Sequence, residues 1–218
     1  MTPARLSLDE LTPADDERLA AALAAARLVC FPTDTVYGIG GFVGRAVVDA
    51  LVAAKGRDEG KPLQVIFPSA DLLIEAVAPP DALCAALLRL LPGALTLVIP
   101  YPPAFSGPPP GHSRGGRPTL GVRVPAWLAP MAALGRLRRP LVASSANLSG
   151  RPSASRLDEV APQIRDACDL LLDGGPAGGL ASTVVDLSEY EAGTWEILRD
   201  GAVSREAVAA ALGASVPR

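Results

Sequence analysis

Short apolar runs alternate with amphipathic segments along this chain, and the alternation predicts the order of its elements. Apolar runs predict strands at residues 28–31, 62–67, 95–99, 120–124, 141–143, 170–172, 184–187 and 195–198. Helical periodicity and helix-start residues predict a short helix after Ser69 and longer helices at about residues 12–26, 45–54, 80–91, 157–167 and 204–213. Strands that alternate with helices indicate an α/β sheet, and the close spacing of the last strands indicates that the sheet is mixed.

One segment breaks this alternation, because residues 101–118 are dense in proline and glycine. Such a segment buries little apolar surface, so we expect a surface loop between two strands. No internal repeat divides the chain, and its 218 residues suit one domain. We therefore expect a single domain over residues 1–218.

Composition and charge narrow the class of protein. Hydrophobic residues make up 49% of the chain, which is enough for a sizeable core, and the formal net charge is −3. This charge argues against a protein that mainly holds nucleic acid on a basic surface. The single histidine excludes His-rich metal sites, and the three cysteines are far apart with no CxxC. We expect reduced thiols, a cytoplasmic location and no resident metal. The chain shows no signal peptide and no long apolar span, so we expect no membrane contact.

The stretch of residues 31–41 carries the first candidate chemistry. After an apolar run it has two threonines, an aspartate and a tyrosine, followed by glycines. Polar groups at the end of a buried strand are typical of the ligand crevice of an α/β protein. The same residue types also favour a plain turn. If Thr33 and Thr35 belong to one extended strand, their side chains share a face and Asp34 points to the other.

Lys55, Arg57 and Lys61 place three cations around the end of a predicted helix. Cations there are favoured by the helix dipole, so ordinary capping is one interpretation. A polyphosphate site is the other, because arginine binds phosphate as a fork and lysine as a point charge. The segment is not a P-loop, since its glycine spacing is one residue short and Pro62 stands where a hydroxyl would bind Mg²⁺.

Polar side chains also accompany three later strands. Ser145 and Asn147 follow an apolar run, where they either cap a helix or donate to phosphate oxygens. Arg123 lies in an otherwise apolar strand and needs a partner there, either a ligand carboxylate or an internal acid. Ser182 stands just before another apolar run. Together these groups suit a crevice for a small anionic or zwitterionic ligand plus a nucleotide.

In this order, the segments resemble the YrdC-like threonylcarbamoyl-AMP synthase family in its short, single-domain bacterial form. The resemblance spans roughly residues 12–212, and the ordered set is specific although no single piece is. The matching segments are Pro32-Thr33-Asp34-Thr35-Val36-Tyr37-Gly38, Lys55-x-Arg57, Lys61-Pro62-Leu63, Pro92-Gly93-x-Leu95-Thr96, Gly121-Val122-Arg123-x-Pro125, Ser145-Ala146-Asn147-x-Ser149-Gly150, Ser182-Thr183-Val184-Val185-Asp186 and Leu198-Arg199-x-Gly201.

The resemblance implies both a fold and a reaction. The implied fold is a twisted, mostly mixed or parallel open sheet with flanking helices and a deep concave cavity. The implied enzyme is a nucleotidyltransferase that condenses L-threonine, bicarbonate and ATP, accompanied by Mg²⁺, into L-threonylcarbamoyladenylate and pyrophosphate. The product would pass to the downstream machinery that makes threonylcarbamoyladenosine in tRNA.

The resemblance also implies roles by position. The signature polar residues expected at the catalytic phosphate site are Lys55, Arg57, Ser145 and Asn147. The residues expected to bind ATP are Arg57, Lys61, Thr119, Ser145, Ser153 and Arg199. The residues expected around L-threonine are Thr33 or Thr35, Tyr37, Arg123, Ala143 through its backbone, and Ser182.

The chain also departs from the family at Asp58, Ala94, Trp127 and Asp200, where other residues are usual. These departures affect details of the pocket more than the reaction. Two alternatives stay open: another carbamoyl-adenylating enzyme on the same scaffold, and a double-stranded RNA-binding module. A weak RNA contact is compatible with either enzyme, but the acidic charge and scarce aromatic residues count against the module.

Overall fold

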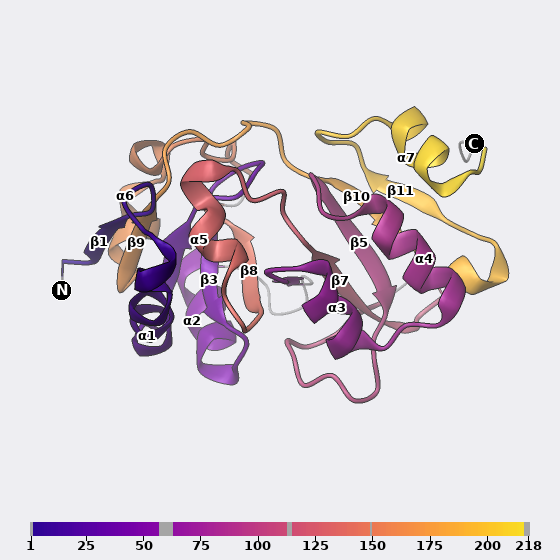
Figure 1. Ribbon diagram of the computed structural model, residues 1–218, viewed down its shortest axis with the longest axis horizontal. Helices are drawn as coiled ribbons and strands as arrows, with labels where there is room; N and C mark the ends of the chain where they lie inside the picture. The colour runs from indigo at the N-terminus through magenta and orange to yellow at the C-terminus, as the bar shows by residue number, and fades with distance from the viewer. Residues whose placement is uncertain (1, 57–62, 113–114, 149, 216–218) are drawn as a thin grey trace.

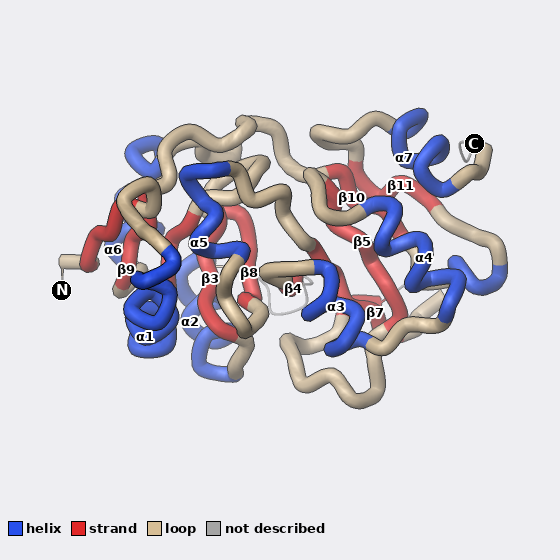
Figure 2. The backbone as a smooth tube through the Cα atoms, viewed as in Figure 1, coloured by secondary structure: helices blue, strands red, loops and turns tan. Residues whose placement is uncertain are grey.

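The chain forms one mixed sheet with helices packed against it, in a computed structural model that describes residues 2–56, 63–112, 115–148 and 150–215 (Figure 1). Within these residues the strand order is β1-β9-β2-β3-β8-β4-β7-β5-β10-β11, and β6 pairs with β7 beside this path. Figure 2 shows the strands, in red, as a band that runs between the blue helices from one end of the molecule to the other. The predicted α/β fold is therefore confirmed.

The strands of this sheet are β1 (Ala4–Ser7), β2 (Val29–Phe31), β3 (Gly38–Phe42), β4 (Gln64–Ile66), β5 (Leu95–Pro100), β6 (Gly111–His112), β7 (Pro118–Arg123), β8 (Leu141–Ser145), β9 (Leu170–Asp173), β10 (Thr183–Asp186) and β11 (Glu196–Arg199). The α-helices are α1 (Asp16–Ala25), α2 (Arg45–Lys55), α3 (Ala70–Val77), α4 (Asp81–Leu90), α5 (Ala132–Gly135), α6 (Pro162–Asp166) and α7 (Arg205–Leu212). Short 3₁₀ turns are η1 (Pro13–Asp15), η2 (Ala129–Met131), η3 (Leu157–Glu159) and η4 (Tyr190–Ala192).

Helices cover both faces of the sheet at the end that holds β2 and β3. Successive residues of a strand point to opposite faces, and β2 divides its side chains in this way. Cys30 belongs to the apolar cluster beneath α2 and α6. Val29 belongs to a different cluster, beneath α1 and α5. This end of the sheet is therefore a three-layer structure, with helix, sheet and helix.

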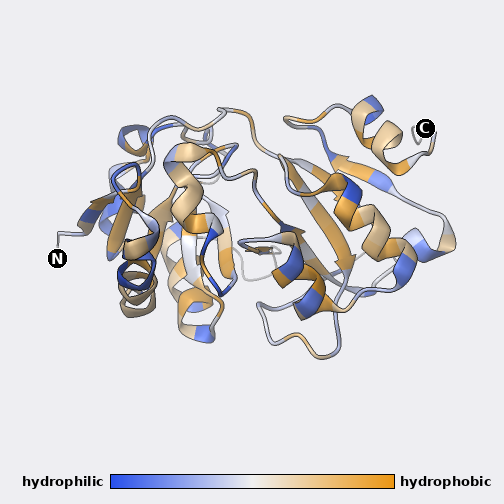
Figure 3. Cartoon of the chain, in the orientation of Figure 1, coloured by the Kyte–Doolittle hydropathy of each residue, from blue (hydrophilic) through white to orange (hydrophobic). Residues whose placement is uncertain are grey.

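The other end of the sheet uses its two faces differently. In β5, Leu95, Leu97 and Ile99 are buried in the cluster formed with α3, α4 and α7. Figure 3 shows the hydrophobic colour along β5 where α4 lies over it. The alternate residues Thr96 and Val98 face the other way and line a cavity. The alternation of side chains along the strands thus separates a packed face from a face that receives a ligand.

Several elements differ from those predicted. β3 was not expected, because glycines at three of its five positions indicate a turn. The predicted helix at 157–167 is interrupted, since the chain leaves η3 in an extended conformation at Val160 and α6 begins at Pro162. Proline suits the first turn of a helix and not its interior. β1 and the short helix α5 were not predicted either.

The proline- and glycine-rich segment 101–118 contains structure of its own. It includes the two-residue strand β6, which pairs antiparallel with β7. Phe105 packs 6.1 Å from the ring of Phe67 and 6.3 Å from that of Tyr101, measured between ring centroids. The Tyr101 hydroxyl donates a 2.9 Å hydrogen bond to the Pro108 carbonyl. The segment therefore contacts the core through two aromatic rings.

Within the described ranges, the longest helices are too short and too polar to cross a lipid bilayer.

Candidate active site

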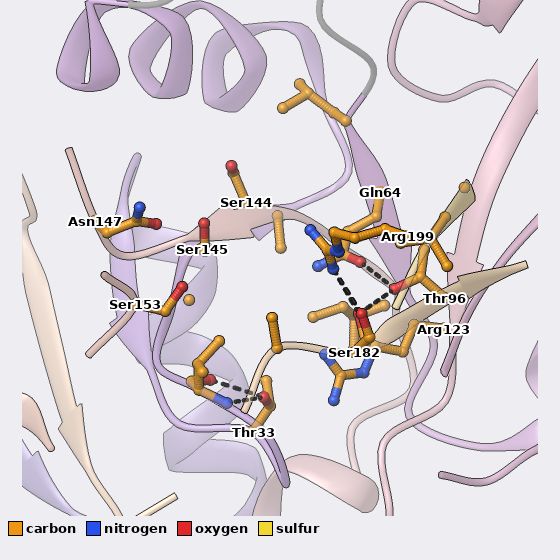
Figure 4. A pocket seen from close by; sticks show the side chains of 18 of the residues that line it. Thr33, Gln64, Thr96, Arg123, Ser144, Ser145, Asn147, Ser153, Ser182 and Arg199 are labelled. Atoms are coloured by element: carbon orange, nitrogen blue, oxygen red, sulfur yellow. Dashed lines mark hydrogen bonds between the residues drawn. The ribbon is translucent and has the colours of Figure 1, made fainter. Parts of the chain in front are cut away.

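A cavity of about 470 Å³ opens at the middle of the sheet, where β8, β4 and β7 lie side by side (Figure 4). The structure brings most of the predicted site residues to this cavity. They are Thr33, Tyr37, Lys55, Thr119, Arg123, Ala143, Ser145, Asn147, Ser153, Ser182 and Arg199. Thr35 does not line the cavity. Arg57 and Lys61 are outside the described residues.

Lys55 joins the end of α2 to β8. Its Nζ donates a 2.6 Å hydrogen bond to the Ser145 carbonyl and a 3.2 Å bond to the Ser144 hydroxyl. The helix ends immediately afterwards, because Gly56 adopts the left-handed conformation with φ of 53°. The ammonium group is thus directed toward the cavity wall formed by β8, which simple capping of α2 would not require.

Asn147 stabilises a turn after β8 and does not cap a helix. Its Nδ2 donates to the carbonyls of Leu148 and Arg151, at 3.1 and 2.6 Å. Its Oδ1 is buried and has no hydrogen-bond partner among the described residues. Of the two roles left open for Asn147, helix capping is therefore wrong, and the fixed amide lines the cavity.

Arg123 forms a buried ion pair with Asp34, and both side chains are almost inaccessible to solvent, at 3% and 7%. Asp34 also accepts a 2.9 Å hydrogen bond from the Ala126 amide, and Arg123 Nη2 donates a 2.7 Å bond to the Thr35 hydroxyl. Burial lowers the pKa of Arg123, and the charge of Asp34 opposes that shift. The partner that this arginine needed is therefore an internal acid. Its Nε remains without a partner among the described residues.

The two threonines after β2 lie in a turn and not in an extended strand. Their hydroxyl oxygens are 3.0 Å apart, and Thr33 donates a 2.7 Å hydrogen bond to the Val36 carbonyl. Thr33 reaches the cavity, whereas Thr35 accepts from Arg123 behind it. The condition for a shared strand face, an extended strand through both residues, is therefore not met, and of the two threonines Thr33 lines the cavity.

Tyr37 lines the cavity, and its fully buried side chain belongs to the apolar cluster beneath α2 and α6. The hydroxyl donates a 2.8 Å hydrogen bond to the Gly175 carbonyl and lies 3.3 Å from the Asp173 carboxylate. Burial raises the pKa of this phenol above its usual range. The phenol therefore connects the turn after β2 with the segment that follows β9.

The cavity floor, defined as Gln64, Thr96 and Ser182, includes two residues that the sequence analysis did not single out. Thr96 Oγ1 lies 3.0 Å from Gln64 Oε1 and 2.8 Å from Ser182 Oγ. Arg199 donates to the Ser182 carbonyl at 2.7 Å and to its hydroxyl at 3.2 Å. Burial lowers the pKa of Arg199. A polar residue inside each of two apolar runs was the sequence signal for Gln64 and Thr96. His112 also lines the cavity without having been predicted.

An open α/β sheet with cations, hydroxyls and amides gathered around one hollow defines a protein that binds small anionic ligands at the centre of its sheet. The chain belongs to the Sua5/YciO/YrdC family. The model of that family, described as "Telomere recombination", matches residues 21–201.

Individual relatives support this assignment. The chain is 33% identical to the threonylcarbamoyl-AMP synthase of Bacillus subtilis over 94% of its own length, and it spans 59% of that protein. It is 32% identical to the threonylcarbamoyl-AMP synthase of Sodalis glossinidius, covering 88% of this chain and 98% of the relative. The crystal structure of P. abyssi Sua5 complexed with L-threonine superposes with a TM-score of 0.75 at 32% identity, over 97% of this chain and 60% of that one.

Proposed function

We propose that the chain is an L-threonylcarbamoyladenylate synthase, a nucleotidyltransferase that condenses L-threonine, bicarbonate and ATP. The observation that carries this proposal is a single cavity lined by Lys55, Arg123 and Arg199 together with hydroxyl and amide groups from separate strands. The similarity to the Bacillus subtilis synthase and to Sua5 complexed with L-threonine supports the same reaction.

In this proposal L-threonine lies beside Arg123, Ala143 and Ser182. The hydrogen bonds of Arg123 to described residues leave from Nη2 alone, so the rest of its guanidinium is available to the α-carboxylate of the amino acid. Thr33 and the Ala143 backbone border the same space. Thr35 does not line the cavity and acts by holding Arg123. Tyr37 lines the cavity, and its hydroxyl holds the segment after β9.

ATP is assigned to the other side of the cavity. Lys55 and Ser145 supply a cation and a hydroxyl for its phosphates, and Arg57 and Lys61 would add two further cations. Asn147 acts beside them by holding the turn after β8, because its Nδ2 donates to the carbonyls of that turn. The other groups assigned to ATP are Thr119, Ser153 and Arg199, which line the same cavity. The described residues contain no cluster of His, Cys, Asp or Glu that could hold a metal ion, so we assign Mg²⁺ to the phosphates of ATP.

The reaction then needs positioning and charge neutralisation more than proton transfer. The threonine amine attacks the bicarbonate carbon, a nitrogen–carbon bond forms, and water leaves. An oxygen of the resulting carbamate attacks the α-phosphorus of ATP, and pyrophosphate leaves. Fixed cations stabilise the charge that develops on the phosphates, and holding three reactants together removes much of the entropic barrier. We place this reaction in the cytoplasm, where the product would pass to the machinery that modifies tRNA.

The test is the release of pyrophosphate from ATP by the purified chain. We expect release only when L-threonine and bicarbonate are both present, with threonylcarbamoyladenylate identified by mass spectrometry. Lys55→Ala is expected to lose most activity while keeping its circular dichroism spectrum, because it removes a phosphate-binding cation from the end of a helix. Turnover with serine in place of threonine would contradict the substrate assignment. Salt-sensitive binding of double-stranded RNA without consumption of ATP would support the RNA-binding alternative.

A further inference from the structure

A chain of hydrogen bonds runs along the cavity floor, and two of its four residues have no proposed substrate. It runs across three strands, from Arg199 on β11 through Ser182, which precedes β10, to Thr96 on β5 and Gln64 on β4 (Figure 4). Arg199 and Ser182 already have proposed substrates. Thr96 and Gln64 have none, although both line the cavity.

The chain of hydrogen bonds has a direction. Arginine can only donate, so the Ser182 hydroxyl accepts from Arg199 at 3.2 Å. Thr96 has one hydroxyl proton and donates it to Gln64 Oε1 at 3.0 Å. The 2.8 Å contact between the two hydroxyls is therefore a hydrogen bond from Ser182 to Thr96. Protons thus point from Arg199 toward Gln64 along the whole chain.

This direction determines what the Gln64 carboxamide offers to a ligand. Its oxygen is committed to Thr96, and its other polar atom is Nε2, a donor with two N–H groups. Among the described residues, Nε2 has no protein hydrogen bond. The end of the chain of hydrogen bonds therefore presents a neutral donor to the cavity.

The backbone register places this donor between the two proposed substrates. Gln64 lies opposite Ala143 of β8 and opposite Gly121 of β7. A Cβ atom at Gly121 would lie 3.6 Å from the Gln64 Cβ and 3.7 Å from the Thr96 Cγ2, so the glycine leaves open the space where these two side chains meet. Ala143 is assigned to threonine, and Arg199, at the far end of the chain of hydrogen bonds, is assigned to ATP. The amine of threonine must receive its new carboxylate group in the space between these two substrates.

We propose that Gln64 binds the carboxylate derived from bicarbonate, by donating from Nε2 to one of its oxygens. This inference rests on the proposed function. A neutral amide suits the task because it orients the carboxylate without neutralising the charge that makes it a nucleophile toward the α-phosphorus. Gln64 forms no covalent bond, and the nitrogen–carbon bond forms with loss of water as described above.

The test compares Gln64→Met and Gln64→Glu with the wild-type protein in buffer depleted of CO₂. Both variants lose the N–H donors, but Gln64→Glu keeps an acceptor for Thr96, so the pair separates the loss of the donor from damage to the chain of hydrogen bonds. Loss of a hydrogen bond to a charged group weakens binding by roughly one to two orders of magnitude, so we expect the KM for bicarbonate to rise about 10- to 100-fold in both variants. The Kd for L-threonine, measured by calorimetry without bicarbonate or ATP, should stay within about twofold of wild type in Gln64→Met, because the donor faces a group that threonine acquires only later.

The outcomes separate this inference from the proposed function. A folded Gln64→Met protein with the wild-type KM for bicarbonate would overturn the role of Gln64 and leave the reaction intact. Equal losses of threonine affinity and bicarbonate affinity in Gln64→Met would also overturn it, since they indicate general damage to the cavity. If the wild-type protein releases no pyrophosphate with threonine and bicarbonate, the proposed function and this inference both fail.

Discussion

At the scale of single residues, the pair formed by Asp34 and Arg123 is the most consequential contact in the site. It joins the turn after β2 to the end of β7, and Asp34 also receives the Ala126 amide. A buried ion pair is costly to break from one side, because the remaining charge keeps its desolvation penalty without its partner. The pair therefore fixes both the position and the charge of the arginine assigned to the threonine carboxylate.

We expect Asp34→Asn to lower the free energy of unfolding by about 3–5 kcal/mol, because Arg123 would keep a buried, unbalanced charge. Urea denaturation followed by circular dichroism measures this loss. Asp200→Asn is the matched control, since it removes the acid from the exposed pair with Arg205 and should change stability far less. Equal losses in the two variants would show that the buried pair has no special weight.

The sequence predicts this contact only in part. An arginine in an apolar strand required a partner, but nothing along the chain distinguished an acid 89 positions away from a ligand carboxylate. The choice between Thr33 and Thr35 as the residue that faces the ligand stayed open for a related reason. The alternation rule applies to extended strands, and Thr33 makes hydrogen bonds within a turn that local pattern does not reveal. Residue types therefore predicted which residues belong to the site better than they predicted the hydrogen-bond and ion-pair partners of those residues.

At the scale of secondary-structure elements, β3 shows why glycine-rich segments are hard to interpret. A Cβ atom at Gly40 would lie 1.9 Å from the Val142 carbonyl oxygen and 2.9 Å from its carbon, so β3 and β8 approach each other too closely for a side chain. Local sequence contains no information about a neighbouring strand 100 residues away. The apolar runs, by contrast, predicted eight strands correctly, because a buried strand needs apolar residues within its own segment of the sequence.

Gly40→Ala is expected to lower the free energy of unfolding by about 3 kcal/mol or more, because the clash is with backbone and no rotamer relieves it. Thermal denaturation of the purified variant measures the effect. Gly93→Ala provides the control, since the nearest atom to its Cβ would be the Leu90 carbonyl oxygen at an ordinary 3.6 Å. If both variants melt at the wild-type temperature, the close approach of β3 and β8 does not require glycine at position 40.

At the scale of the whole molecule, the cavity lies between apolar clusters that belong to opposite ends of the sheet. Trp195 is buried in the cluster of α3, α4 and α7, and Trp127 packs against the cluster of α1 and α5. Residues that line the cavity come from strands of both ends, including Gly38 on β3 and Thr96 on β5. We propose on this basis that residues 1–218 form one cooperative domain and that ligand stabilises both ends together.

Two single-tryptophan variants, Trp127→Phe and Trp195→Phe, test this proposal, because each leaves a fluorescent reporter at one end. In each variant, the melting curve followed by tryptophan fluorescence should coincide with the melting curve of the same variant followed by circular dichroism. The two fluorescence curves, compared after this correction for the effect of each substitution, should then report one transition. At a concentration of L-threonine 100 times its Kd, binding adds about 2.7 kcal/mol to the stability of the folded state. Since 1 kcal/mol moves the Tm of a domain of this size by about 2–4 °C, both curves should rise by about 5–10 °C. A shift confined to one tryptophan, or two separate transitions, would contradict a single domain.

The strand order has a consequence for synthesis on the ribosome. β9 lies between β1 and β2 and pairs parallel with both, yet it is formed by Leu170–Asp173. Until those residues leave the exit tunnel, β1 has no neighbour, and β2 offers an unpaired edge to other chains. A nascent chain of this protein therefore carries an open strand edge at β2 until β9 emerges about 140 residues later, and only then can this part of the sheet form.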